Sequence, residues 1–412
     1  MNQFRWFIYV LLTLPFIFSG HASAEPIPKA DCHLHLVNFL QNGEFWSESK
    51  RQFIDPSTRA ILPAGKRGAR IVGILKRMDE AGVREAMISG MPFVKKWAST
   101  DAFRSTYYLD SESRVVTARD TDFTVALSIQ DYLAAGGDTA SKNRKRLYPF
   151  VCGFDATDMG AVDMVIKRIK EFPGLWEGIG EIMSRHDDLT NLTSDERPVA
   201  NHPALHRMAD FAGAANLPLT IHHNIAPVSS ANAPRPVVYL PELIELFDAH
   251  PKTAIIWCHA GISRRVIVEN LTGVLEGILA KPGRKDHIYI DLSWVVYENY
   301  IYGPGVDHRK NWCDLIAKFP SNFMIGSDAV ADFKEYSKEI NRYDALFEVL
   351  KAYPNGDAMV AQVARQNFVK LMESLRQKRG GLGCILPENY LYPEDNYVNP
   401  TKTYRLQDPR PK

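Results

Sequence analysis

Two histidines near the start of the chain, His33 and His35, are separated by a single residue. The stretch from Asp31 to His35 has the length and composition of a short strand, and alternate side chains of a strand share one face. Both imidazoles should therefore point the same way. Two imidazoles on one strand can chelate a metal ion, because the strand fixes both before the ion arrives. A half-buried pair bonded to the backbone would show the same spacing, so the interpretation depends on residues further along the chain.

Strand-like apolar runs alternate with helical stretches from Ala30 onward. This alternation implies parallel strands joined by right-handed crossovers, and a count of eight favours an α/β fold of the closed (β/α)8 TIM-barrel type over an open sheet. The predicted strands are 29–35, 84–89, 148–154, 176–182, 218–223, 253–259, 287–292 and 322–327. The predicted helices are 69–81, 122–135, 161–171, 203–215, 241–249, 264–279, 311–318, 338–352 and 358–377.

Long loop insertions are expected after the first and second strands, and an irregular tail begins at Arg379. Residues 1–24 read as a secretory signal peptide: Arg5 precedes an apolar run, and Ala22-Ser23-Ala24 supplies small residues for cleavage. The apolar run is too short for a membrane span, so no stable membrane anchor is expected. The sequence thus predicts a periplasmic or secreted protein with a barrel at 25–378 and a C-terminal extension at 379–412.

The charge balance is nearly even, with 49 Lys and Arg against 48 Asp and Glu, so nothing points to nucleic acid as a partner. A small-molecule substrate is the expected partner, and a homo-oligomer is compatible with the sequence. The five cysteines include no CxxC pair, and a chain of this size needs no disulfide framework.

Barrel enzymes place their chemistry at the C-terminal ends of the strands. Four of the predicted strands end at a residue that can bind a metal, in addition to the His-x-His strand; these residues are Glu181, His222, His259 and Asp328. Such a set indicates one shared metal site. His223 should face away from His222, toward the helices.

Five motifs carry a family resemblance: Asp-Cys-His-Leu-His, Ile-Gly-Glu-Ile, Leu-Pro-Leu-Thr-Ile-His, Ile-Ile-Trp-Cys-His-Ala-Gly and Met-Ile-Gly-Ser-Asp. They resemble the strand-end motifs of the amidohydrolase superfamily, in particular its amidohydrolase-related (family 2) branch, over nearly the whole chain from Asp31 to about Leu371.

The resemblance implies a role for each strand-end residue. His33 and His35 would ligate a first metal, His222 and His259 would belong to a second site or to substrate activation, and Asp328 would be a ligand and proton acceptor. Many members have a carboxylated lysine that bridges two metals on strand four. Glu181 stands in that place here, as in TatD-like hydrolases, so one or two ions are both compatible with the sequence.

Imidazole and carboxylate ligands together suit zinc, and manganese or iron less specifically. A bound divalent ion lowers the pKa of water to about 7. The sequence therefore predicts an exported metal-dependent hydrolase that acts on a carbonyl (ester, lactone or amide) or phosphoester centre, with Asp328 and His259 as catalytic residues. The predicted substrate-binding residues follow strands four, six and seven; they are Arg185, Arg264 and Trp294.

Two alternatives remain open. One is a metal-dependent decarboxylase of an aromatic or unsaturated acid, which consumes no water. The other is a non-catalytic metal- or ligand-binding barrel.

Overall fold

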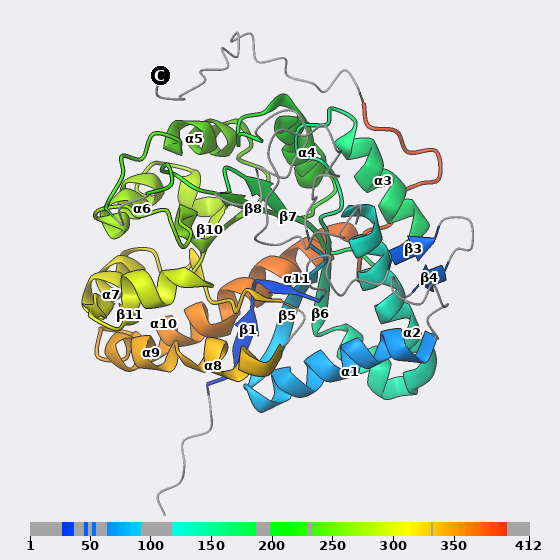
Figure 1. The fold of residues 1–412 in the computed structure, drawn as a ribbon, viewed down its shortest axis with the longest axis horizontal. Helices are drawn as coiled ribbons and strands as arrows, with labels where there is room; N and C mark the ends of the chain where they lie inside the picture. The colour runs from blue at the N-terminus through cyan, green and yellow to red at the C-terminus, as the bar shows by residue number, and fades with distance from the viewer. Residues whose placement is uncertain are drawn as a thin grey trace, which may run out of the picture.

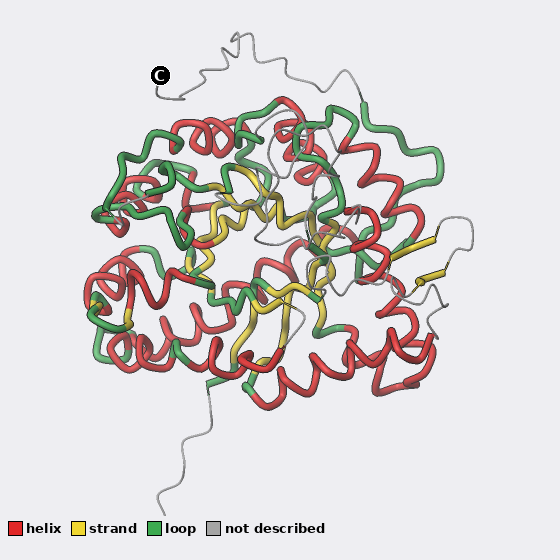
Figure 2. The backbone as a smooth tube through the Cα atoms, in the orientation of Figure 1, coloured by secondary structure: helices red, strands yellow, loops and turns green. Residues whose placement is uncertain are grey.

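The computed structural model describes residues 27–36, 45–47, 52–54, 64–91, 118–186, 198–229, 233–330 and 333–393. The ten strands of the main sheet form a ring in the middle of the molecule, and most helices lie around it (Figures 1 and 2). The ring strands are β1 (Lys29–Asp31), β2 (Leu34–His35), β5 (Val83–Ser89), β6 (Leu147–Val151), β7 (Gly178–Ser184), β8 (Leu219–His223), β9 (Ile255–Cys258), β10 (Ile288–Asp291), β13 (Phe323–Met324) and β14 (Ala329–Val330). The predicted signal peptide and the end of the predicted tail lie outside the described residues.

All pairs of ring strands are parallel, in the order β13-β10-β9-β8-β7-β6-β5-β2-β14, with β1 also paired to β5. The two ends of this order belong to one short segment of chain. Between them the Cys32 N–H donates to the Ile325 carbonyl (3.0 Å), and the Asp328 N–H donates to the His33 carbonyl (2.8 Å). The sheet therefore closes on itself with eight strand positions, of which the first and the eighth are each broken in two. This confirms the predicted (β/α)8 TIM-barrel type.

The helices follow the strands in the predicted alternation. They are α1 (Ala64–Glu80), α2 (Ala118–Arg144), α3 (Ala161–Glu171), α4 (Pro203–Ala214), α5 (Leu240–Ala249), α6 (Leu271–Leu279), α7 (Arg309–Lys318), α8 (Tyr336–Asn341), α9 (Asp344–Leu350), α10 (Gly356–Ala361) and α11 (Asn367–Arg379). Short 3-10 or π turns occur at His259–Gly261, Arg284–Asp286, Tyr297–Ile301, Phe333–Glu335 and Gln362–Gln366. Two small hairpins pair β3 (Phe45–Ser47) with β4 (Gln52–Ile54) and β11 (Tyr302–Gly303) with β12 (Val306–Asp307).

Several helix predictions differ from the structure. The helix predicted at 69–81 begins at Ala64, and the helix predicted at 358–377 is divided into α10 and α11 by a π turn. The helix predicted at 264–279 begins only at Leu271, because Asn270 adopts a left-handed backbone and caps it by accepting a hydrogen bond from the Gly273 N–H (3.2 Å). The helix predicted at 338–352 is divided into α8 and α9. The helix predicted at 122–135 extends to Arg144, with a break at Gly137, whose φ of 56° suits glycine.

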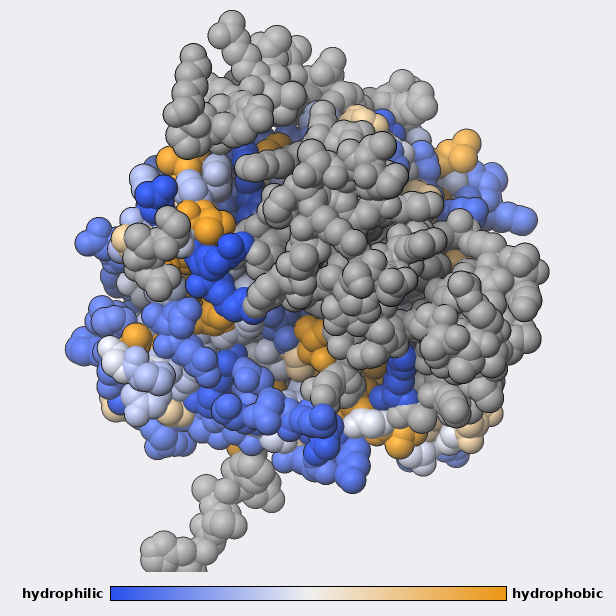
Figure 3. All heavy atoms as spheres, in the orientation of Figure 1, coloured by the Kyte–Doolittle hydropathy of each residue, from blue (hydrophilic) through white to orange (hydrophobic). Residues whose placement is uncertain are grey.

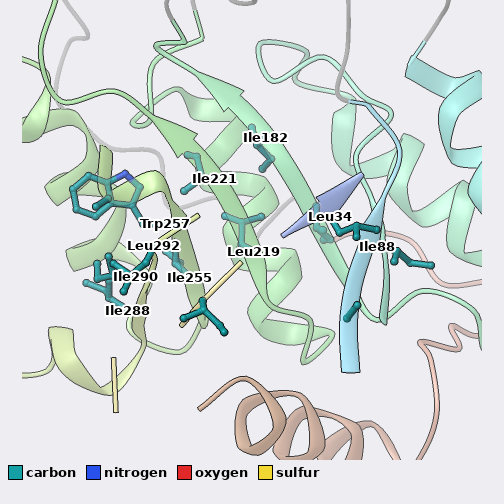
Figure 4. Packing of buried hydrophobic residues seen from close by; sticks show 14 of the residues in the cluster. Leu34, Ile88, Ile182, Leu219, Ile221, Ile255, Trp257, Ile288, Ile290 and Leu292 are labelled. Carbon is teal, nitrogen blue, oxygen red and sulfur yellow. The ribbon is translucent and has the colours of Figure 1, made fainter. Parts of the chain in front are cut away.

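The core has two layers, and neighbouring residues of β5 show why. Ile88 packs outward between the sheet and the helices, in the large cluster to which Leu219 and Ile290 also belong (Figure 4). Met87 belongs to a second cluster together with inward residues of the other strands. Side chains of α11 complete this second cluster; they are Phe368, Leu371, Met372 and Leu375. Helix α11 therefore covers one end of the barrel, next to the beginnings of the strands.

The outer face shown in Figure 3 is mostly hydrophilic over α7 to α9 at the lower left. Within the described residues, the helices are all too short or too polar to cross a membrane. All five cysteines are buried and unpaired.

Candidate metal centre

The six predicted metal-binding residues meet at the C-terminal ends of the strands. His33 follows β1, His35 lies in β2, Glu181 in β7 and His222 in β8; His259 follows β9 and Asp328 precedes β14. Five of the six side chains are at most 2 % exposed, whereas Asp328 is 15 % exposed. The predicted set is thus one buried cluster with a single partly accessible member.

Unusual backbone geometry brings these side chains into position. Gly180, with φ of 117°, passes so close to β8 that a Cβ there would lie 2.2 Å from the Thr220 carbonyl oxygen, so only glycine fits before Glu181. His259 and Asp328 have φ values of 53° and 52°, a left-handed conformation that is rare outside glycine and that often marks functional sites.

Asp31 stabilises the backbone just before Asp328. Its carboxylate accepts hydrogen bonds from the Ser327 hydroxyl (2.6 Å) and from the Ser327 N–H (2.9 Å), and so ties the first strand to the residue before Asp328.

Four atoms form a first group: Nε2 of His33 and of His35, Oε2 of Glu181 and Oδ1 of Asp328. The two imidazole nitrogens lie 3.2 Å apart. Glu181 Oε2 lies 3.5 Å from His33 Nε2 and 3.4 Å from His35 Nε2, and Asp328 Oδ1 lies 3.4 Å from each. A tetrahedral zinc site with bonds of about 2.0–2.1 Å has ligand atoms about 3.3–3.4 Å apart. These five separations therefore fit neighbouring ligand atoms around one divalent ion.

The other oxygen of Glu181 faces a second pair of imidazoles. Oε1 lies 3.3 Å from His222 Nδ1 and 3.5 Å from His259 Nε2. Each carboxylate oxygen thus serves one histidine pair, which is the arrangement of a bridging carboxylate. It is compatible with one ion or two.

The electrostatics of the cluster favour a cation. Burial alone would lower the pKa of His35, but hydrogen bonds to Asp328 and Glu181 outweigh it and raise this pKa to about 9. Burial disfavours the Glu181 carboxylate, yet the charge of His33 and hydrogen bonds from the histidines hold its pKa well below the ordinary value. The carboxylates of Glu181 and Asp328 thus favour positive charge in a largely buried site, and a divalent ion can supply that charge in place of protons.

The ring orientation of His35 also suits a metal. Its Nδ1 lies 2.8 Å from the Gly90 carbonyl oxygen, which can only accept a hydrogen bond. Nδ1 therefore carries a proton, and in the neutral ring the Nε2 lone pair points to the centre of the first group.

The three predicted substrate-binding residues lie in different surroundings. The Trp294 ring lies beside the imidazoles of His259 and His222, with centroids 5.1 and 6.4 Å away, and the Arg264 guanidinium lies over that indole at 5.4 Å. Arg185 instead pairs with Glu242, with Nε 3.0 Å from Oε2, and covers a tyrosine ring. Trp294 and Arg264 therefore border the cluster, whereas the charge of Arg185 is already compensated.

Sequence reasoning missed Asp291, Ser293 and His186. Asp291 ends β10, and its Oδ2 lies 2.8 Å from His33 Nδ1. Ser293 lies 2.9 Å from His259 Nδ1, and the ring of His186 lies 4.4 Å from that of His222. Asp291 occupies the same strand-end position as the predicted ligands, so applying the strand-end rule to the seventh strand would have found it. His186 lies in the turn after β7, where no pattern marks it.

A comparison with protein families shows that a model described as Amidohydrolase matches residues 30–371. A search of curated proteins finds no match.

Similar solved structures include a 2,6-dihydroxybenzoate decarboxylase from Rhizobium, with 16% identity and a TM-score of 0.46 over 84% of this chain and 99% of that chain. A zinc-bound amidohydrolase from Burkholderia multivorans has 12% identity and a TM-score of 0.43, again over 84% and 99%. An amidohydrolase 2 from Bifidobacterium longum subsp. infantis has 12% identity and a TM-score of 0.39 over the same shares. Because the family model extends from β1 into α11, this protein belongs to the amidohydrolase family.

Proposed function

We propose that this protein is an exported metal-dependent hydrolase that acts on a carbonyl centre (ester, lactone or amide) or on a phosphoester. His33, His35, Glu181 and Asp328 would hold a divalent ion, with zinc favoured by the ligand types and the spacing of their atoms. His222 and His259 would hold a second ion or contact the substrate. Such an ion acts as a Lewis acid and lowers the pKa of bound water to about 7.

The observation that carries the proposal is the placement of Asp328. Its Oδ1 lies 3.4 Å from both first-strand imidazoles, and its Oδ2 lies 4.0 Å from His259 Nε2. It is also the one ligand candidate with appreciable exposure, at 15 %. A carboxylate that touches both the ion site and the accessible side of the cluster can take a proton from the attacking water and deliver it to the leaving group.

Substrate contacts are expected on the side of Trp294 and Arg264. The indole is half-buried beside His259, and the Arg264 residue above it is exposed. A planar organic group can stack on such a ring, and a guanidinium can bind a carboxylate or phosphate. The same pair favours a second candidate function, decarboxylation of an aromatic or unsaturated acid.

One experiment separates these functions. The purified protein is analysed for metal content and then incubated with esters, lactones, amides, phosphoesters and aromatic acids in ¹⁸O-labelled water. Hydrolysis incorporates one labelled oxygen into the product, whereas decarboxylation releases carbon dioxide and leaves the organic product unlabelled. Metal binding without turnover of any of these substrates would favour the non-catalytic barrel.

Export is tested separately. The apolar run and the small residues before Glu25 support cleavage between Ala24 and Glu25. N-terminal sequencing of protein from the periplasm or the medium should begin at Glu25. A protein that keeps Met1 would contradict the export part of the proposal.

A further inference from the structure

Asp291 and Ser293 lie behind the metal centre, on the side away from its ligand atoms. Both side chains are completely buried. The Asp291 carboxylate is surrounded by donors: the Ser293 N–H (2.7 Å), the Cys32 thiol (3.4 Å), the Ser293 hydroxyl (2.6 Å) and His33 Nδ1 (2.8 Å). An ionised carboxylate can only accept hydrogen bonds, so His33 Nδ1 must carry the proton that it shares with Asp291.

The Ser293 hydroxyl extends this arrangement to a second histidine. Because its proton is donated to Asp291, its oxygen is left to accept a hydrogen bond from His259 Nδ1, 2.9 Å away. His259 Nδ1 must therefore carry a proton as well. In both neutral rings the lone pair then lies on Nε2, the atom that faces the cluster.

These two Nε2 atoms face opposite oxygens of one carboxylate. His33 Nε2 lies 3.5 Å from Glu181 Oε2, and His259 Nε2 lies 3.5 Å from Glu181 Oε1. We propose that Asp291 and Ser293 are positioning residues of the metal centre: one buried carboxylate fixes the ring orientation and proton position of His33 directly, and those of His259 through the serine hydroxyl. The two halves of the centre are thereby organised together.

This inference rests on the proposed metal centre and is independent of the reaction catalysed. Partners that orient metal-bound histidines typically change metal affinity by about 10–100-fold when removed. In Asp291→Asn the amide oxygen is expected to accept the Ser293 N–H, so the amide NH₂ would face His33 Nδ1. That donor would move the His33 proton to Nε2 and point it at the metal position.

The test uses cobalt(II) as the probe, with its affinity measured by chelator competition and its ligand geometry by visible absorption. Asp291→Asn should bind cobalt about 10–100-fold more weakly than wild type and should change the absorption bands. Ser293→Ala should show a smaller loss with changed bands, and Ser293→Thr, which keeps the hydroxyl, should restore both. Cys32→Ala is the matched control, since it removes a contact of Asp291 that leads to no histidine.

The outcomes distinguish this inference from the proposed function. If wild type binds cobalt but Asp291→Asn and Ser293→Ala keep its affinity and spectrum, the positioning role is wrong. Equal losses of cobalt affinity in Cys32→Ala and Ser293→Ala would also contradict the positioning role, because they would show an effect of core packing alone. Should Asp291→Asn fail to fold, the comparison of Ser293→Ala with Ser293→Thr decides alone. Cobalt binding that depends on these residues, in a protein without turnover, would uphold the inference and contradict the proposed enzyme.

Discussion

At the scale of single residues, Asp328 differs from the other members of the cluster in its access to solvent. The side chains of the four histidines and of Glu181 are buried, whereas the Asp328 carboxylate is partly exposed and still lies beside His33 and His35. A group that exchanges protons with a substrate must be accessible to it, and the Asp328 carboxylate meets this requirement.

Replacing Asp328 by asparagine separates ligation from proton transfer. The amide oxygen can still coordinate an ion, but the amide cannot accept a proton. We expect near-normal metal content and a turnover loss of about 10²–10⁴, which corresponds to about 3–5 kcal/mol of transition-state stabilisation. Asp357→Asn, at an exposed position of α10, is the control. An Asp328→Asn protein that loses its metal, or keeps full turnover, would show that the proton-acceptor role is wrong.

His206 in α4 gives a prediction about pH. Its Nδ1 lies 2.7 Å from His250 Nε2, and His250 Nδ1 lies 2.9 Å from Asp210. Burial, together with the charges of His250 and His202, lowers the pKa of His206 to about 4, although the charges of Glu245 and Asp210 oppose this shift. An unfolded histidine titrates near 6.5. Between pH 6.5 and 4 the histidine of the unfolded chain binds a proton, whereas His206 in the native state stays neutral. The free energy of unfolding that depends on neutral His206 is therefore fully present above pH 6.5 and is lost as the pH falls toward 4.

The comparison of wild type with His206→Gln isolates this effect. Any stability advantage of wild type should shrink by about 1.4 kcal/mol per pH unit between pH 6.5 and 4, as measured by urea unfolding. His308→Gln, at an exposed position, controls for the loss of a histidine as such. A difference between wild type and His206→Gln that stays constant with pH would mean that His206 is not held neutral.

At the scale of elements, the strands were predictable because their two-sided apolar runs reflect burial on both faces. The clustering of the candidate ligands could be predicted because strand ends are a fixed location in a barrel. Asp291 also ends a strand, so the same rule could have placed it near the site, but its contact with His33 is visible only once the sheet is closed. The late start of α6 has a local cause, the cap at Asn270, whereas the pairing of Arg185 with Glu242 depends on a distant partner that no local pattern encodes.

The glycine of Met-Ile-Gly-Ser-Asp illustrates how an element supports the site. A Cβ on Gly326 would lie 3.0 Å from Asp291 Oδ1 and equally close to the Cβ atoms of His33 and Ser293. Gly326→Ala should therefore push these groups apart, destabilise the fold by about 1–3 kcal/mol and weaken metal binding. Chemical unfolding and cobalt titration measure the two effects.

Gly277→Ala in α6 is the matched control, because nothing lies within 4 Å of the added methyl group. That variant should be neutral or slightly more stable, since alanine favours a helix. Full metal affinity in Gly326→Ala would show that the space beside Asp291 is not critical.

At the scale of the whole molecule, the candidate ligand residues come from the first, fourth, fifth, sixth and eighth strand positions, so a bound ion would connect distant parts of the barrel. The junction of the first and eighth positions is held by short strands of two residues, β2 and β14. An ion shared by His33, His35 and Asp328 would reinforce this junction.

Metal removal should therefore lower the stability of the entire barrel. With free metal at about 100 times its dissociation constant, binding to the native state contributes about 2.7 kcal/mol, so a chelator should lower the unfolding midpoint by several degrees and added zinc should restore it. The double variant His33→Ala/His35→Ala should remain folded, because its changes lie at a strand end, and should no longer respond to chelator or zinc. Differential scanning calorimetry at fixed metal concentrations measures both proteins. If the double variant responds to chelator as wild type does, the stabilising ion is bound somewhere other than at these histidines.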